Sequence, residues 1–246
     1  MKDLKAIVLA AGKGTHMRTE GCDLPKVMRT ALGKPLLYYV LSALPVEKKE
    51  DAVIIVGYKK ETVMEAFSGY TFAVQEEQKG TGHAASCAEG ALKDFDGNVI
   101  ICCGDTPLIS AETYDALVKT HVEEENDCTM LSGTSPEPLK GYGRVMHDEN
   151  GAFLKIVEER DCTPEEAKIQ EYNSGVFVFR AKKLFSALKE LKTDNAQGEY
   201  YLTDAPYIMK ARGDKVGVCV RPMGDELIGV NTPEQLSEVE RILLSR

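Results

Sequence analysis

Three short segments carry residue types that bind phosphate and metal. Leu9 to Thr15 is a turn with Gly12 and Gly14 that follows an apolar run. Its glycines let the main chain approach a ligand and turn N–H groups toward phosphate oxygens. Lys26 follows Pro25, whose ring restricts the backbone, and Asp105 follows a second apolar run. A lysine and a carboxylate near a glycine turn favour a phosphorylated ligand and a magnesium ion, although Asp105 could instead cap a helix and Lys26 could be a solvated surface residue.

The glycine turn differs from two familiar nucleotide motifs. Met17 stands where a dinucleotide fingerprint needs a third glycine, and the pattern Gly-x-x-x-x-Gly-Lys-Ser/Thr is absent. A dinucleotide-dependent oxidoreductase is therefore disfavoured. No Ser-His-Asp or Cys-His arrangement has the spacing of a covalent catalyst, so no covalent enzyme-bound intermediate is expected.

Strands and helices alternate in the first half of the chain, and they must position these residues. Continuous apolar runs predict buried strands at Leu4–Ala10, Ala52–Gly57 and Val99–Gly104, with a shorter strand at Thr71–Val74. Helical spacing occurs in Pro35–Leu44, Glu61–Phe67 and His83–Lys93. This alternation predicts a parallel sheet covered on both faces, with ligands bound beyond the carboxyl ends of its strands. The ends at 11–15, 75–82 and 104–108 are expected to meet there.

The pattern changes from about Asn126. Strands are expected at Cys128–Gly133, Gly143–His147, Ala152–Glu158 and Tyr172–Arg180, and then helix, strand and helix at Lys182–Leu191, Val216–Arg221 and Pro233–Leu244. We predict an α/β, Rossmann-like fold: a mixed, mostly parallel sheet flanked by helices, with a smaller antiparallel β layer inserted. No linker or repeat divides the chain, so residues 1–246 are expected to form a single domain.

Several segments, in this order along the chain, resemble sugar-nucleotide pyrophosphorylases, a nucleotidyltransferase family. The resemblance rests on Leu9–Thr15 with Pro25–Met28, Gln75–Ala84, Gly104–Leu108, Gly141–Arg144, Asn173–Gly175 and Asn195–Asp204. Together they are most similar to the uridylyltransferase domain of N-acetylglucosamine-1-phosphate uridylyltransferases. The resemblance implies a glycosyltransferase-A-like fold in which residues 1–125 bind mainly the nucleotide and 126–246 mainly the sugar phosphate.

The activity that this resemblance implies is Mg²⁺-dependent uridylyl transfer. UTP and N-acetylglucosamine-1-phosphate would give pyrophosphate and UDP-N-acetylglucosamine, a sugar nucleotide used as a cell wall precursor. Two alternatives stay open. The enzyme could use another sugar phosphate or nucleotide, such as glucose-1-phosphate or dTTP, or the chain could be a catalytically weak nucleotide-sugar-binding homologue.

The resemblance also assigns roles to individual residues. It gives catalysis to Lys26 and Asp105, and we add Arg18 to the catalytic residues as a hypothesis of our own. The metal ligands that it implies are Asp105 and Asn231, although Asn231 could also be a helix N-cap near Pro233. The nucleotide is expected to contact Leu9, Ala10, Ala11, Gly12, Gly14, Thr15, Lys26, Gln75, Gly80 and Thr81. The sugar phosphate is expected to contact Gly143, Glu158, Asn173, Tyr201 and Thr203. The Gln75 amide offers a donor and an acceptor, which suits the imide edge of uracil, and His83 is expected to start a helix rather than act as a base.

The chain departs from the family pattern in two places. His16 stands where the family has an arginine, and a neutral histidine lacks the fixed charge and forked donors of a guanidinium. The stretch from Met17 to Pro25 is also longer than usual, and we hypothesise that it lets Arg18 take the missing role. In addition, no hexapeptide repeats of an acetyltransferase β-helix precede Arg246, so only the uridylyl step is expected.

Composition limits the partners. With 30 basic and 39 acidic side chains the 246 residues carry a formal charge of −9, which disfavours nucleic-acid binding. No apolar run is long enough for a membrane span, and no signal-peptide pattern is present. The seven cysteines form no CxxC pair and are expected as free thiols in the reducing cytoplasm. We therefore expect small-molecule substrates, no nucleic acid and no membrane partner, with the oligomeric state left open.

Overall fold

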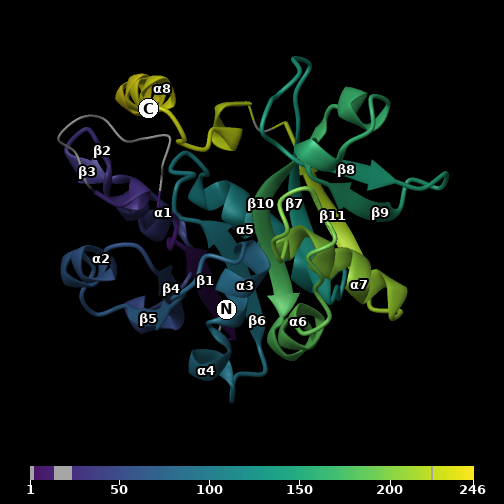
Figure 1. Cartoon of the computed structure of the whole chain (residues 1–246), viewed down its shortest axis with the longest axis horizontal. Helices are drawn as coiled ribbons and strands as arrows, with labels where there is room; N and C mark the ends of the chain where they lie inside the picture. Colours follow the sequence, from purple (N-terminus) through teal and green to yellow (C-terminus); the bar gives the residue numbers. More distant parts are fainter. Residues whose placement is uncertain (1–2, 14–23, 223) are drawn as a thin grey trace.

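The computed structural model describes residues 3–13, 24–222 and 224–246. Within these ranges the chain forms one mixed sheet of nine strands and a separate pair of short strands, β2 (Thr30–Ala31) and β3 (Lys34–Pro35). In Figure 1 the large sheet runs from β5 and β4 on the left, through β1, to β7 and β11 on the right. The expected fold class, a mixed sheet flanked by helices, is confirmed.

The parallel part of the sheet comes from the apolar runs of the first half. Its strands are β1 (Leu4–Leu9), β4 (Ala52–Val56), β5 (Thr71–Val74) and β6 (Asn98–Cys103), in the order β6-β1-β4-β5. In β1, Ala6 and Val8 pack into the core on one face, while Ile7 packs into the core on the other. Because both faces are buried, Ala6 to Leu9 are apolar without alternation, and Lys5, near the start of the strand, is the one charged residue in it.

Helices cover the two faces. On one face lie α1 (Leu36–Ala43), α2 (Lys60–Ala66) and α5 (Ala111–Glu123). On the other lie α3 (Thr81–Ser86), α4 (Glu89–Leu92), α6 (Ala181–Leu188) and α7 (Ala205–Ala211). The last helix, α8 (Pro233–Ser245), packs beside β2. No helix among the residues described here combines the length and the apolar character that crossing a bilayer requires.

The second half of the chain extends the same sheet. Strands β7 (Cys128–Thr134), β10 (Glu171–Arg180) and β11 (Val216–Arg221) continue it, and β10 runs antiparallel between β6 and β7. Strands β8 (Arg144–His147) and β9 (Phe153–Val157) form an antiparallel pair that joins β10 where Arg144 lies beside Tyr172. Of the four strands expected after Asn126, β7 and β10 lie in the continuous run of the sheet, and the antiparallel addition is limited to β8 and β9, which branch from β10.

Three helical features differ from the expectation. The segment His83–Lys93 is split between α3 and α4, and α5 and α7 were not predicted. Helix α5 has a clear local start, because the Ser110 hydroxyl accepts a hydrogen bond from the Thr113 amide at 3.2 Å. Its apolar face buries Tyr114, Leu117 and Val118 against the sheet.

Candidate active site

Lys26 contacts both of the side chains expected to bind metal. It begins a 3-10 turn, Lys26–Met28, that is anchored by the buried Val27 and Met28. Its Nζ forms an ion pair with Asp105 Oδ2 and donates a hydrogen bond to Asn231 Oδ1 at 2.8 Å. Three residues that are far apart in the sequence therefore meet around one positive charge.

Main-chain contacts bring Asn231 to this place. The Val230 amide donates to the Asp105 carbonyl at 2.9 Å, so the segment before α8 lies against the end of β6. The Asn231 Nδ2 donates to the Gly229 carbonyl at 3.4 Å, which leaves Oδ1 facing Lys26. The N-cap of α8 is Thr232, which forms a capping box with Gln235, so the alternative role of Asn231 as that cap is not what the structure shows.

The oxygens of Asp105 and Asn231 suit a magnesium ion. Both are hard donors, and both already approach a single cation, the Lys26 ammonium. No group of three or more His, Cys, Asp or Glu side chains suited to a metal occurs in the part of the chain that the structure describes. A divalent ion held here would complete its shell with water and substrate phosphates, as magnesium sites in phosphoryl-transfer enzymes commonly do.

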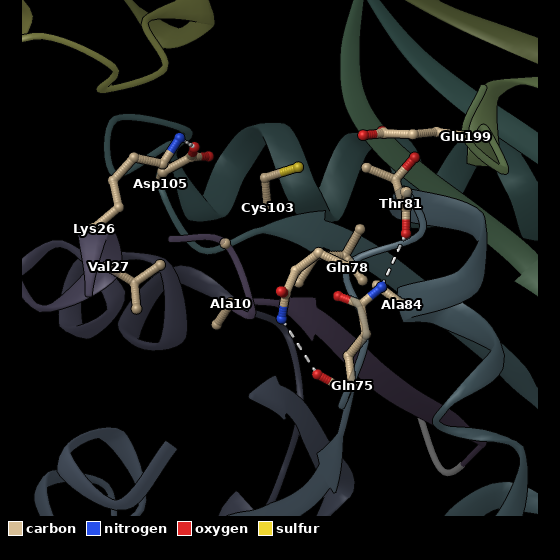
Figure 2. A pocket seen from close by; sticks show the side chains of 13 residues that line it. Ala10, Lys26, Val27, Gln75, Gln78, Thr81, Ala84, Cys103, Asp105 and Glu199 are labelled. Carbon is tan, nitrogen blue, oxygen red and sulfur yellow. Dashed lines mark hydrogen bonds and ion pairs between the residues drawn. The ribbon is translucent and has the colours of Figure 1, made fainter. Parts of the chain in front are cut away.

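A pocket opens beside Lys26 and Asp105 (Figure 2). Of the residues expected to bind the nucleotide, those that line it are Leu9, Ala10, Gly12, Lys26, Gln75, Gly80 and Thr81. Ala11 does not line it, because this residue is buried and its carbonyl accepts a hydrogen bond from the Tyr58 amide at 3.4 Å. Gly14, Thr15 and Arg18 lie outside the described residues.

At the end of the pocket away from Lys26, the loop around Gly80 is fixed by hydrogen bonds from the Gln75 side chain and with the Tyr200 main chain. Gln75 is only 3% exposed, and its Nε2 donates to the Gly80 carbonyl at 3.1 Å. Gly80 has φ of +104°, and a Cβ there would lie 2.6 Å from the Tyr200 carbonyl oxygen. Because Tyr200 also pairs with the main chain of Lys79 and Gly82, at 2.9 and 2.8 Å, this close approach needs glycine.

The residues expected at the sugar phosphate form two adjoining pairs and one separate member. The Asn173 amide donates to the Gly143 carbonyl at 2.9 Å, and the Thr203 hydroxyl donates to Glu158 Oε1 at 2.9 Å. The pairs are close, since a Cβ on Gly143 would lie 3.5 Å from Glu158 Cδ. The Tyr201 hydroxyl instead accepts from Gln197 Nε2 at 2.8 Å. Tyr201 and Glu158 line a second hollow with Asp161 and Asp204.

Electrostatics connect the two groups of residues. Burial raises the pKa of the Glu158 carboxyl, and the hydrogen bond from Thr203 partly offsets this. Burial also raises the pKa of the Cys103 thiol, and the nearby Asp105 and Glu158 carboxylates act in the same direction. Cys103 lines the pocket, and the carboxylates of both Asp105 and Glu158 are near enough to act on it.

Sequence reasoning assigned no role to several residues that line the pocket. They are Val27, Gln78, Ala84, Cys103 and Glu199. All except Cys103 lie inside segments that carried the resemblance, so their neighbourhood was a usable signal. Cys103 was interpreted as a buried strand residue, although it is the last residue of β6 and only partly buried.

The strand order and the pocket beyond the carboxyl ends of the parallel strands define an α/β protein that binds a ligand at this edge of its sheet. Residues 5–222 match the family model described as nucleotidyl transferase, and the chain belongs to that family. The predicted enzyme class, nucleotidyltransferase, is thereby confirmed.

The chain is also similar to the bifunctional protein GlmU of several bacteria. The protein of Syntrophomonas wolfei subsp. wolfei is 42% identical over 99% of this chain and 54% of its own length. That of Lactobacillus delbrueckii subsp. bulgaricus is 44% identical, over 98% and 51%. That of Caldanaerobacter subterraneus subsp. tengcongensis is 42% identical, over 100% and 53%. The chain thus spans about half the length of these curated relatives.

One solved structure supports the fold. It is a Bacillus anthracis protein assigned as a glucose-1-phosphate thymidylyltransferase, in complex with a sucrose. The TM-score is 0.75, at 21% identity, over 97% of this chain and 94% of that one.

Proposed function

We propose that this chain catalyses Mg²⁺-dependent uridylyl transfer from UTP to N-acetylglucosamine-1-phosphate, with release of pyrophosphate. One observation carries the proposal: the Lys26 ammonium, the Asp105 carboxylate and the Asn231 amide oxygen meet at one end of a pocket that Gln75, Gly80 and Thr81 close at the other. A charged end and an amide end match a nucleoside triphosphate, which has a charged tail and a hydrogen-bonding base. Similarity to the GlmU proteins supports this choice.

In this proposal an acceptor phosphate oxygen attacks the α-phosphorus of UTP, and the bond to the β-phosphate breaks. Catalysis then depends on positioning and on charge stabilisation. Gly12, together with Gly14 and Thr15, holds the triphosphate, and Lys26 stabilises the negative charge that develops on it. Mg²⁺, held by Asp105 and Asn231, would neutralise charge on the phosphate oxygens.

The acceptor sugar would bind on the 126–246 side. Its hydroxyl and acetamido groups need donors and acceptors, and Gly143, Glu158, Asn173, Tyr201 and Thr203 supply carbonyl, carboxylate, amide and hydroxyl groups. Glu158 is half-buried next to Thr203, and such a carboxylate binds a sugar hydroxyl more strongly than an exposed one does. We further propose that the protein works in the cytoplasm, which suits the free thiols of its six described cysteines.

A substrate panel tests the proposal. Pyrophosphate release is measured with UTP or dTTP, with N-acetylglucosamine-1-phosphate or glucose-1-phosphate, and with Mg²⁺. The highest kcat/KM is expected for UTP with N-acetylglucosamine-1-phosphate. A higher value for dTTP with glucose-1-phosphate would replace this function with a thymidylyltransferase. UTP binding without pyrophosphate release from any pair would identify a non-catalytic binding protein.

Arg18 has its own test, because it lies outside the described residues and its role is a hypothesis. If it takes the role of the family arginine that His16 replaces, Arg18→Ala lowers kcat/KM. Unchanged turnover in that variant would remove Arg18 from the catalytic residues.

A further inference from the structure

The Gln75 side chain uses both of its amide hydrogens on the protein. Its Nε2 lies 3.1 Å from the Gly80 carbonyl and 3.1 Å from His83 Nδ1. A carbonyl can only accept, so the Gly80 contact fixes which end of the amide is the nitrogen. With one N–H directed at Gly80, the second is directed at His83.

This arrangement determines the state of the His83 ring. Nδ1 must carry a lone pair to accept from an amide nitrogen, so the ring proton is on Nε2. His83 also lines a separate hollow with Lys79, Ser86 and Tyr200. It therefore contacts the Gln75 amide without lining the pocket beside Lys26.

The remaining polar atom of Gln75 is Oε1. No described residue donates a hydrogen bond to it, and Gln75 lines the pocket. In Figure 2 the amide nitrogen is joined by a dashed line toward the Thr81 side, and the oxygen points away from it, toward Gln78. Gln75 therefore offers the pocket an acceptor only, and the expectation from the sequence that it offers both a donor and an acceptor is wrong. A flipped amide would place its oxygen against the Gly80 carbonyl oxygen and the His83 Nδ1 lone pair, and both contacts would be repulsive.

We propose that His83 is a positioning residue for base selection, which holds Gln75 with its acceptor toward the base; this rests on the proposed use of UTP. Uracil has an N–H at N3 and can donate to Gln75 Oε1. Cytosine has a lone pair at N3 and would oppose it, so it could pair only with a flipped amide. A site whose amide is locked in one orientation discriminates between such bases more strongly than one whose amide is free to turn.

Substitutions at His83 test the proposal. His83→Leu and His83→Met remove the acceptor, and His83→Asn keeps an oxygen that can take the place of Nδ1. We expect the ratio of kcat/KM for UTP to that for CTP to fall about tenfold in the first two variants, mainly through KM, because one amide hydrogen loses its partner. The asparagine variant is expected to restore most of the ratio. Ser86→Ala, which changes the same separate hollow without touching Gln75, is the control.

Two results would overturn the proposal: an unchanged ratio in the leucine and methionine variants, or an equal loss in the asparagine variant. The unmodified protein gives a further test that does not depend on the folding of a variant, because nitrogen-15 NMR spectra report the His83 tautomer. A proton on Nδ1 would contradict the proposed hydrogen bond from Gln75. Calorimetric binding of UTP and CTP separates this proposal from the proposed function. If the protein binds UTP but turns none over, the function fails, and the binding ratio alone decides the role of His83.

Discussion

Lys26 is the residue on which the site is centred. Its ammonium contacts the Asp105 carboxylate and the Asn231 amide oxygen. In the proposed function this positive charge would offset part of the negative charge of a bound triphosphate. Asp105 and Asn231 are two oxygen donors of the kind that magnesium prefers. The three side chains therefore form one polar unit, in which a substitution of Lys26 or Asp105 changes the charge and a substitution of Asn231 removes a neutral oxygen donor.

The first prediction concerns this unit. Lys26→Ala is expected to lower kcat about 10²- to 10³-fold, the usual loss when a group that stabilises transition-state charge is removed. Asp105→Ala is expected to raise the Mg²⁺ concentration needed for half-maximal rate as well. Steady-state pyrophosphate release over a Mg²⁺ titration measures both effects. Lys48→Ala, at an exposed lysine that does not line the pocket, is the control. Kinetics equal to those of the parent in both site variants would exclude Lys26 and Asp105 from the site.

At the scale of elements, the pocket depends on how loops leave the sheet. The loop after β5 closes the end of the pocket away from Lys26 because Gly80 comes within contact distance of the Tyr200 main chain. Gly90, in α4, is exposed and has open space around it. The two glycines thus differ in what an added methyl group would meet.

The second prediction compares these glycines. Gly80→Ala is expected to lower the free energy of unfolding by about 2 kcal/mol or more, from positive φ and the clash with Tyr200, and to raise KM for UTP. Gly90→Ala is expected to raise stability by about 0.5–1 kcal/mol, because alanine favours a helix. Urea unfolding of both variants measures the difference. A Gly80→Ala protein as stable as Gly90→Ala would contradict the packing described here.

Helix α5 is joined to the sheet by a buried polar chain. His121 Nε2 pairs with Asn98 Oδ1 at 3.2 Å, and Nδ1 pairs with the Thr129 hydroxyl at 3.0 Å. Burial lowers the pKa of His121 to about 4, and the nearby Arg180 acts in the same direction. The ring is therefore neutral in the folded protein at pH 7.

The third prediction follows from this shift. Below pH 6.5 the unfolded chain protonates His121 while the folded one does not, so the unfolded state binds more protons and stability falls as the pH falls from about 6.5 to about 4. The contribution lost is about 3 kcal/mol. The free energies of unfolding of His121→Gln and of the parent are measured from about pH 6.5 to about pH 4. The change in their difference over this range gives the contribution of His121 protonation. A difference independent of pH would show that His121 is not held neutral.

Sequence patterns predicted some of these elements and missed others for physical reasons. Strands β1, β4 and β6 were found because a strand buried on both faces is a continuous apolar run. Helix α5 was missed although Ser110 and the spacing of Tyr114, Leu117 and Val118 were available as signals. The strands that pair with β7 and β10 could not be predicted from the sequence, because neither strand of such a distant pair encodes the pairing by itself.

The site was predictable only as a set of residues. Lys26 and Asp105 were singled out by residue type and position as well as by the resemblance, and Asn231 by the resemblance alone. The contact between Lys26 and Asn231 joins residues that are 205 positions apart in the sequence. The main-chain hydrogen bond from Val230 to Asp105 and the tautomer of His83 depend on contacts that form only in the folded chain. No local sequence pattern predicts either of them.

At the scale of the whole molecule, the two halves share one sheet. Strand β10 pairs on one side with β6, from the first half, and on the other with β7, from the second. The site is shared in the same way, since Asn231 and Glu199 come from the second half and Lys26 and Gln75 from the first. We therefore propose that residues 1–246 act as one domain.

The fourth prediction tests this unity. Because neither half has a complete sheet of its own, thermal unfolding is expected to show a single calorimetric transition that coincides with loss of far-UV circular dichroism. Ten tyrosines and no tryptophan make tyrosine fluorescence a third probe. Two separate transitions would indicate that the halves fold independently.

The most direct test of the central claim is a crystal structure of the protein with UTP and Mn²⁺, a substitute for Mg²⁺ with an anomalous signal. The account predicts an anomalous peak within coordination distance of Asp105 and Asn231, triphosphate oxygens at Lys26 and the uracil beside Gln75. A manganese peak elsewhere, or a nucleotide bound away from these four residues, would contradict it.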